Sequence, residues 1–169
     1  MRRAIFRGGG PATDAGLTLI ELMIVVAVLA ILATIVVPTY GMYTTKVRRA
    51  DGTATATAVA LAQERHFSIY QTYVVVSNAT QAKELVDKAG LDGQLAALTS
   101  PKGYYSWSAS AATVDGACGD IRQCFLVSVK PVAGKAQAND EKCTEMLLDS
   151  SGVKEGKPAT PPHECWGKQ

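Results

Sequence analysis

The sequence has few of the residues on which enzyme active sites depend. His66 and His163 are its only histidines, which leaves little acid–base chemistry available near neutral pH. It contains no G-x-S-x-G nucleophile motif, no phosphate-binding P-loop motif and no H-E-x-x-H zinc motif. We therefore predict that the protein is not an enzyme, has no catalytic residues and needs no cofactor.

The spacing typical of metal ligands is also missing. His66 has no second ligand three or four residues away, and we expect it to face solvent or to cap a helix. Cys143, His163 and Cys165 form the best alternative metal set, but the paired C-x-x-C spacing of zinc sites is absent. We predict no metal site.

An excess of charge of one sign is missing too. The chain carries a net charge of +2, with 17 Lys and Arg against 15 Asp and Glu. The first 16 residues hold three of those Arg and one Asp, so residues 17–169 contain 14 of each sign. Nucleic-acid binding depends on a basic surface, so this balance predicts no nucleic-acid partner. We expect Lys46, Arg48 and Arg49 to form a polar collar beside a membrane helix.

One long hydrophobic run is present, from Leu17 to Val37, and Glu21 is its only ionisable residue. About twenty residues in a helix rising 1.5 Å each span the hydrocarbon core of a bilayer. A single span in lipid must be helical, because its backbone groups have to be satisfied within the segment. A simple signal anchor would show the same run. A carboxylate inside it is costly, which makes Glu21 a candidate functional residue.

The residues on the two sides of this run predict its orientation. The leader before it is short and basic and has no apolar core of its own, unlike an ordinary secretory signal peptide. Three basic residues lie close to each end of the run, so positive charge does not decide the orientation. The four cysteines all follow the run, and an even number suits an oxidising compartment. We therefore expect the C-terminal domain in the periplasm.

The stretch Gly16-Leu17-Thr18-Leu19-Ile20-Glu21, followed by the apolar run and Pro38, resembles the prepilin cleavage motif of type IV pilins and pseudopilins. The resemblance implies that a prepilin peptidase in the inner membrane cuts between Gly16 and Leu17 and methylates the new N-terminus. The carboxylate that this family uses in assembly falls on Glu21. In one departure from the family pattern, Leu17 stands where Phe is usual.

The position of Glu21 also has a physical explanation. Cleavage would turn a neutral amide into a cationic amine at Leu17, and residues i and i+4 share one helix face. Two unit charges about 4 Å apart attract by roughly 4 kcal/mol at an effective dielectric near 20, before desolvation is subtracted. The pair could form within one chain or between staggered neighbours, where it would fix an axial register. The resemblance favours the intermolecular pair.

Beyond Pro38, which should loosen the helix at the membrane exit, we expect the helix to continue to about Ile69 as an amphipathic half. Its apolar stripe would cover a sheet and form the core of the subunit. This stripe comprises Tyr40, Tyr43, Val47, Ala50, Ala54, Ala58 and Leu61. The polar residues Lys46, Arg48, Arg49, Asp51 and Gln63 would lie on the other faces.

The rest of the chain predicts a short helix and a sheet. The short helix is expected over Thr80–Ala89, with Thr80 as its N-cap and Gly90 as its stop. Strands are expected over Tyr104–Val114, Gln123–Val132 and Cys143–Leu148. The turn Asp149-Ser150-Ser151-Gly152 would return the chain at Val153, giving an antiparallel sheet of three or four strands.

The run from Ala50-Asp51-Gly52, together with Tyr70, Tyr73 and Gly103-Tyr104-Tyr105, resembles PilE-type minor pilins. The resemblance implies an α+β type IV pilin fold, in which a long N-terminal helix packs on the antiparallel sheet and a disulfide closes the C-terminal loop. Four cysteines allow three connectivities. Sequence proximity and the resemblance together favour Cys118–Cys124 with Cys143–Cys165. Pseudopilins usually have a calcium loop instead, and Asp140, Glu141 and Asp149 leave that alternative open.

We therefore predict five segments along the chain. They are a cleaved leader (1–16), a transmembrane and filament-core helix (17–37), the amphipathic half of the same helix (38–70), a connecting loop (71–102), and a sheet with the C-terminal disulfide loop (103–169). The connecting loop is a candidate contact surface.

The resemblance implies a structural subunit, a minor pilin, of a type IV pilus. Its partners would be other pilin subunits, the prepilin peptidase and the inner-membrane assembly platform. The precursor would cross the inner membrane once before it joins a pilus on the cell surface. The alternative is a pseudopilin of type II secretion, and a DNA-receptor minor pilin and a membrane-anchored periplasmic enzyme rank below it.

Overall fold

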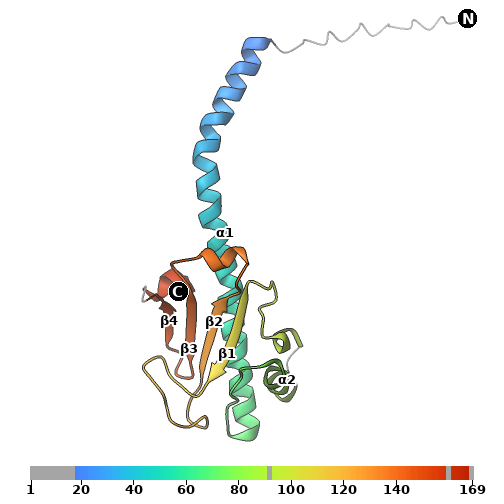
Figure 1. Ribbon diagram of the computed structural model, residues 1–169, viewed down its shortest axis with the longest axis vertical. Helices are drawn as coiled ribbons and strands as arrows, with labels where there is room; N and C mark the ends of the chain where they lie inside the picture. Colours follow the sequence, from blue (N-terminus) through green and yellow to red (C-terminus); the bar gives the residue numbers. More distant parts are fainter. Residues whose placement is uncertain (1–17, 91–92, 159–160, 168–169) are drawn as a thin grey trace, which may run out of the picture. The chain divides into compact units, whose positions relative to one another are not determined.

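The computed structural model describes residues 18–90, 93–158 and 161–167 (Figure 1). The chain divides into two compact units, Met1–Gly41 and Met42–Gln169. The helix α1, Leu19–Tyr70, is 52 residues long, continues through Pro38 and contributes to both units.

In the first unit, the described residues belong almost entirely to the apolar part of α1. Every side chain from Thr18 to Val37 is exposed. An 18-residue window of α1 has a mean hydropathy of 3.0, so this helix is long and apolar enough to cross a membrane. A helix that is apolar on all sides is stable only in lipid or against other apolar surfaces.

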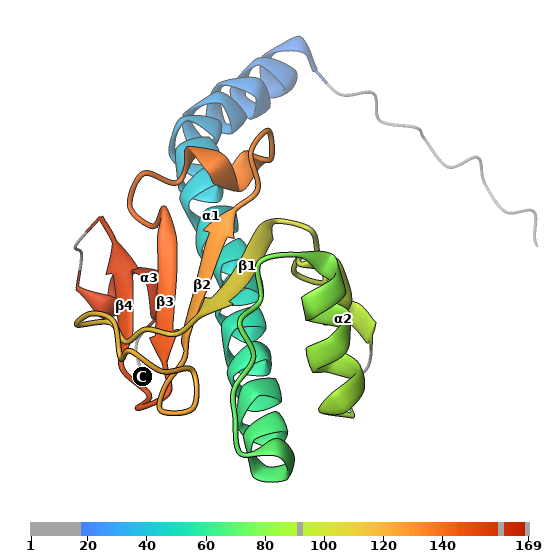
Figure 2. The same ribbon diagram turned by 60° about the horizontal axis from the view of Figure 1, so that its bottom comes forward.

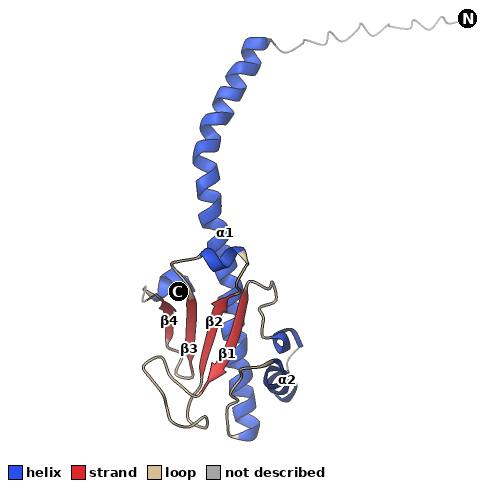
Figure 3. Ribbon diagram, in the orientation of Figure 1, coloured by secondary structure: helices blue, strands red, loops and turns tan. Residues whose placement is uncertain are grey.

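The second unit, which we call the head, contains a four-stranded antiparallel sheet (Figure 3). Its strands are β1 (Tyr105–Ser110), β2 (Leu126–Pro131), β3 (Glu145–Asp149) and β4 (Lys154–Lys157), in the spatial order β1-β2-β3-β4. The register places Trp107 opposite Val129, Val129 opposite Met146, and Met146 opposite Gly156. Alternation along β1 buries Tyr105, Trp107 and Ala109, because successive side chains point to opposite faces of a strand.

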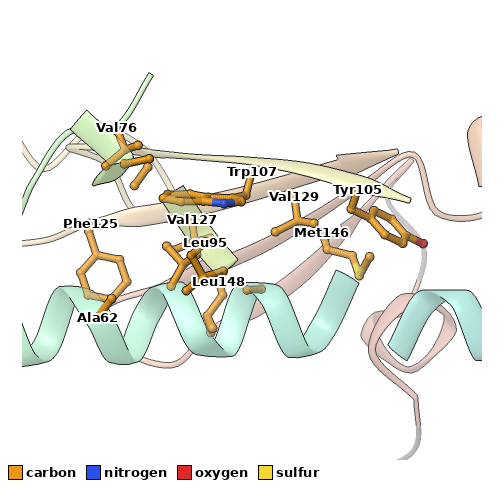
Figure 4. Close-up of a cluster of buried hydrophobic side chains, with 14 of the residues drawn as sticks. Ala62, Val76, Leu95, Tyr105, Trp107, Phe125, Val127, Val129, Met146 and Leu148 are labelled. Atoms are coloured by element: carbon orange, nitrogen blue, oxygen red, sulfur yellow. The ribbon is translucent and has the colours of Figure 1, made fainter. Parts of the chain in front are cut away.

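The core of the head lies between the sheet and the C-terminal half of α1 (Figure 4). Ala62 on the helix and Val127, Val129 and Met146 on the strands are fully buried there. The helix α2 (Ala79–Lys88) lies beside α1 near β1 and adds Leu85 to this core (Figure 2). Short helices complete the head: η1 (Gly93–Ala97), η2 (Ala136–Asn139) and α3 (Pro162–Trp166).

A glycine allows the helix to approach the sheet closely. A Cβ atom added at Gly52 would collide with the Met146 side chain and would lie 3.2 Å from Tyr105 ring atoms. Gly52 therefore lets the backbone of α1 pack directly against the side chains of Tyr105 in β1 and Met146 in β3.

The expectation that the apolar stripe of α1 covers the sheet is wrong. Tyr43 is 65% exposed, Leu61 is 48% exposed, and Ala50 and Ala54 are exposed as well. The buried face instead carries polar residues, namely Arg49, Asp51, Thr55, Gln63 and His66, alongside Gly52, Ala56, Val59 and Ala62. Arg49, Asp51, Gln63 and His66 find hydrogen-bond partners outside α1, and a helical pattern cannot reveal such partners.

Two local expectations also need correction. The side chain of Asn78, not that of Thr80, caps α2: Asn78 Oδ1 accepts a hydrogen bond from the amide of Gln81 at 3.0 Å. The helix ends at Lys88, and Gly90 follows with a φ of 64°, where glycine is favoured. The strand β1 ends at Ser110 and not near Val114, and residues 111–125 form the loop between β1 and β2.

Candidate functional site

Glu21 lies in the first turn of α1 with its side chain exposed among exposed apolar side chains. Its amide donates a hydrogen bond to Thr18 Oγ1 at 3.3 Å. Gly16 and Leu17 lie outside the described residues, so cleavage at this bond, methylation of Leu17 and pairing of Glu21 with the new amine remain predictions. The assembly role of Pro38 also remains a prediction.

The exposed stripe of α1 in the head is the second candidate surface. It comprises Tyr43, Val47, Ala50, Ala54, Thr57 and Leu61. These residues recur every three or four positions, so they lie on one helix face. We call this set the outer stripe. Side chains of this size and polarity suit contact with another helix.

On the opposite face of α1, Arg49 makes a buried ion pair with Asp140, which follows η2. Arg49 Nε donates to Asp140 Oδ2, and Arg49 Nη2 donates to Asp140 Oδ1, each at 2.6 Å. Arg49 Nη1 also donates to the carbonyl of Glu164 in α3. The hydrogen bond and charge of Asp140 raise the pKa of Arg49 even though burial lowers it. Arg49 is therefore not part of a solvated collar.

Two further polar side chains hold the segment that follows α1. Gln63 forms two hydrogen bonds with the backbone of Val74: Nε2 donates to its carbonyl at 2.6 Å, and Oε1 accepts from its amide at 2.9 Å. His66 is buried, with Nδ1 2.7 Å from the carbonyl of Thr72. His66 therefore does not face solvent, and its role is to bind the backbone beyond the helix.

The cysteines form the disulfides Cys118–Cys124 and Cys143–Cys165, which is the connectivity that proximity and the resemblance favour. The first bond closes part of the loop between β1 and β2. The second, buried at both cysteines, joins the start of β3 to α3. A metal site built from Cys143 and Cys165 is therefore wrong, because a disulfide sulfur is not a thiolate ligand.

Asp149 organises the turn between β3 and β4. Its Oδ1 accepts hydrogen bonds from the amide and hydroxyl of Ser151 and from the amide of Val153, at 2.7–3.0 Å. Its Oδ2 accepts one from the amide of Val114 at 3.3 Å. Burial alone would raise the pKa of Asp149, but these hydrogen bonds outweigh it and lower the pKa.

The calcium alternative is not supported. The carboxylate oxygens of Asp149 face N–H and O–H donors, and those of Asp140 face Arg49 and Gln137. Among the described residues, no group of three or more His, Cys, Asp or Glu side chains could hold a metal ion.

The charge on the surface of the head differs from what the count of acidic and basic residues in the sequence suggests. Among the described residues, three carboxylates are buried (Asp51, Asp140 and Asp149) but only one basic residue, Arg49. Burial therefore removes more negative than positive charge from the surface. The exposed head is more basic than the count of 14 residues of each sign suggests.

Several exposed lysine residues lie at one end of the sheet, where β1 and β3 begin and β2 and β4 end. We call this the basic end; it comprises the half-buried Arg48 and the exposed Lys102, Lys130, Lys135, Lys142 and Lys157. Two acidic residues lie at the same end, the exposed Glu141 and the half-buried Glu145. Lys130 and Lys157 lie 3.3 and 3.2 Å from the Glu145 carboxylate, so one acid faces two ammonium groups. The Arg48 guanidinium lies over the Tyr104 ring, 5.3 Å from its centroid.

The opposite end of the head has no such excess. Tyr73 links α1 to the loop between β1 and β2 there: its hydroxyl donates to Glu64 at 3.2 Å, and its amide donates to Ile121 O at 3.3 Å. The charged residues at this end include Glu64, Arg65, Asp115, Asp120 and Arg122, and Lys154 at the start of β4. Their charges are mixed, so the basic end is a local feature of the head.

Comparison with known proteins identifies two matching family profiles. A family described as "Prokaryotic N-terminal methylation motif" matches residues 12–37. A family described as "Type IV minor pilin ComP, DNA uptake sequence receptor" matches residues 38–147, well over half of the chain. No curated protein matches.

One solved structure similar to the chain is described as a type IV pilin from Shewanella oneidensis. It shares 24% sequence identity, with a TM-score of 0.40 over 70% of this chain and 96% of that one. The resemblance to type IV pilins and the α+β pilin fold are confirmed, since the family profiles and the observed elements agree. This family and fold are those of structural proteins. The chain belongs to the type IV minor pilin family whose profile spans residues 38–147.

Proposed function

We propose that this chain is a minor subunit of a type IV pilus that assembles through α1. The observation that carries this proposal is the apolar surface of α1 that the described part of the chain leaves uncovered. It includes all sides of residues 19–37 and the outer stripe of the head. Exposed apolar surface of this extent marks an interaction site with lipid or protein.

The proposal includes the following steps, which the resemblance to prepilins supports. The precursor crosses the inner membrane once, with its cysteine-containing head in the periplasm. The prepilin peptidase cuts between Gly16 and Leu17 and methylates Leu17, and the assembly platform then transfers the helix from lipid into the filament. Glu21 pairs with the N-terminal amine of a neighbouring subunit, which fixes the axial register.

This proposal is tested by recovering sheared surface filaments and measuring the amount of this chain in them. Glu21→Ala should leave leader cleavage intact and greatly reduce incorporation, whereas Glu64→Ala, an exposed carboxylate of the head, should have no effect. Normal incorporation of Glu21→Ala would refute the register argument. Gly16→Val should block cleavage, which leaves an unshifted precursor band when the peptidase is present.

We further propose that the head binds DNA, although the equal numbers of acidic and basic residues in the sequence argue against this function. Two observations support it. The matching family is described as a DNA uptake sequence receptor, and the basic end gathers six basic residues on one part of the head. The net charge of the sequence does not reveal this excess, because it counts Asp51, Asp140 and Asp149, which are buried. Lysine and arginine at this end would contact phosphates and release counterions.

The test is fluorescence anisotropy of a labelled random-sequence DNA duplex with the full chain in a non-ionic detergent, over a series of salt concentrations. The logarithm of the association constant should fall linearly with the logarithm of salt. Lys135→Ala, which removes one phosphate contact, should reduce that slope by about 0.9. Lys83→Ala is the control, because Lys83 lies on α2 and pairs with Asp87. Absence of salt-dependent binding would reject the DNA proposal and leave the assembly proposal intact.

A further inference from the structure

We infer that Asp140, held by Arg49, is a positioning residue for DNA binding: it fixes the segment 132–144 that carries Lys135 and Lys142. This inference rests on the proposed DNA-binding function. It concerns residues that are themselves too buried to touch DNA, since the side chains of Arg49 and Asp140 are 8% and 4% exposed.

The segment 132–144 connects β2 to β3 and has little apolar surface of its own. Its buried residues are Gln137, Asp140 and Cys143, and the others are half-buried or exposed. Cys143 is tied by its disulfide to Cys165. The middle of the segment is therefore held by polar contacts and not by a hydrophobic anchor.

Those contacts converge on one carboxylate. Asp140 Oδ2 accepts hydrogen bonds from Arg49 Nε at 2.6 Å and from Gln137 Nε2 at 2.7 Å, while Oδ1 accepts from Arg49 Nη2 at 2.6 Å. Two parallel hydrogen bonds from a planar guanidinium fix orientation as well as distance. Because Arg49 also donates to Glu164 O, one guanidinium joins α1, the segment and α3.

This geometry suits a role in preorganisation. A buried ion pair adds little net stability compared with an apolar pair of the same shape, because desolvation offsets much of its attraction. It does fix the backbone on both sides of Asp140, and Lys135 and Lys142 lie within this fixed segment. A surface segment that is ordered before binding loses less conformational entropy when it meets a ligand. The pair would therefore raise DNA affinity without contributing charge to the interface.

The test compares Asp140→Asn with the wild-type chain, using the same labelled duplex and the full chain in detergent. Asp140→Asn removes the charge pairing and should weaken DNA binding about tenfold, the loss expected when a few side chains must be ordered on binding. The salt slope should stay unchanged, because no phosphate contact is lost. Lys135→Ala should also weaken binding, but it should reduce the salt slope, because it removes a phosphate contact.

Two controls separate positioning from stability. Val59→Ala lowers the stability of the head through a fully buried residue of α1 and should leave DNA affinity unchanged. Hydrogen exchange should quicken in residues 133–142 of Asp140→Asn and not in those of Val59→Ala. If Asp140→Asn does not fold, Gln137→Ala removes one hydrogen bond to the same carboxylate and should give a smaller loss of affinity with the same slope.

The outcomes are distinct. If the wild-type chain binds DNA and the folded variants bind with equal affinity, the positioning inference is overturned and the DNA proposal stands. If the wild-type chain shows no salt-dependent binding, both are rejected. A reduced salt slope in Asp140→Asn would also overturn the inference, because it would mean that phosphate contacts were lost.

Discussion

The two faces of α1 in the head do not divide into apolar and polar as in an ordinary amphipathic helix. The face toward the sheet buries Arg49, Asp51 and Gln63, whereas the opposite face exposes the outer stripe. In a monomeric globular protein, the apolar face covers the core and the polar face meets water. This division suits the proposed assembly: α1 contacts the head through specific polar bonds and small side chains, and the outer stripe stays available to another subunit.

The largest effect should come from breaking the buried ion pair on the sheet-facing side. Arg49→Ala leaves Asp140 buried without its charge partner and should lower the free energy of unfolding by about 3–5 kcal/mol. Denaturant unfolding of the full chain in detergent measures it. Arg48→Ala is the matched control, because Arg48 is half-buried and stacks on Tyr104; its loss should cost at most about 1 kcal/mol. Equal losses of unfolding free energy in Arg49→Ala and Arg48→Ala would show that the buried ion pair contributes no more than an ordinary half-buried arginine.

A smaller effect is expected from filling the closest helix–sheet contact. Gly52→Ala introduces a Cβ atom against Met146 and Tyr105 and should cost roughly 1–3 kcal/mol. Gly41→Ala provides the comparison, since nothing lies within 4 Å of its added Cβ. That change should be neutral or slightly stabilising, because alanine favours helix over glycine. A stabilised Gly52→Ala variant would mean that the sheet does not pack this closely.

Removing the polar contact of Gln63 should have a smaller effect again. Gln63→Ala deletes two hydrogen bonds to the half-buried backbone of Val74 and should cost about 1 kcal/mol. Amide exchange at Val74 should quicken in the same variant. If the Val74 amide stayed protected, Gln63 would not be what holds the connection after α1.

The smallest effect on stability and a large effect on assembly are expected on the outer stripe. Leu61→Asp should change the free energy of unfolding by no more than about 0.5 kcal/mol, as for other exposed sites. It should nevertheless reduce recovery of the chain in sheared filaments, because a carboxylate would enter an apolar contact. Val153→Asp is the control, since Val153 is similarly exposed (45%) but lies in the turn before β4. Normal assembly of Leu61→Asp would exclude the outer stripe from the filament contact.

Several features could be predicted because local sequence specifies them. The apolar run and the helical period predict α1, and alternation between turn residues predicts the antiparallel strands. The cysteine spacing and the resemblance favour the observed disulfides. The cap of α2 is also specified locally, because Asn78, two positions before Thr80, is itself a common capping residue. Its signal was present in the sequence.

The sequence by itself determined a long helix, an apolar first segment with one carboxylate, and a small antiparallel sheet, because these follow from hydrophobicity and period along the chain. Only the tertiary structure decided which face of α1 is core. Burying Arg49 depends on Asp140, and placing Gln63 depends on Val74. The basic end likewise depends on which carboxylates are buried, which total charge does not reveal. Such decisions rest on contacts between distant residues, and a buried polar group is stable only when those partners are in place.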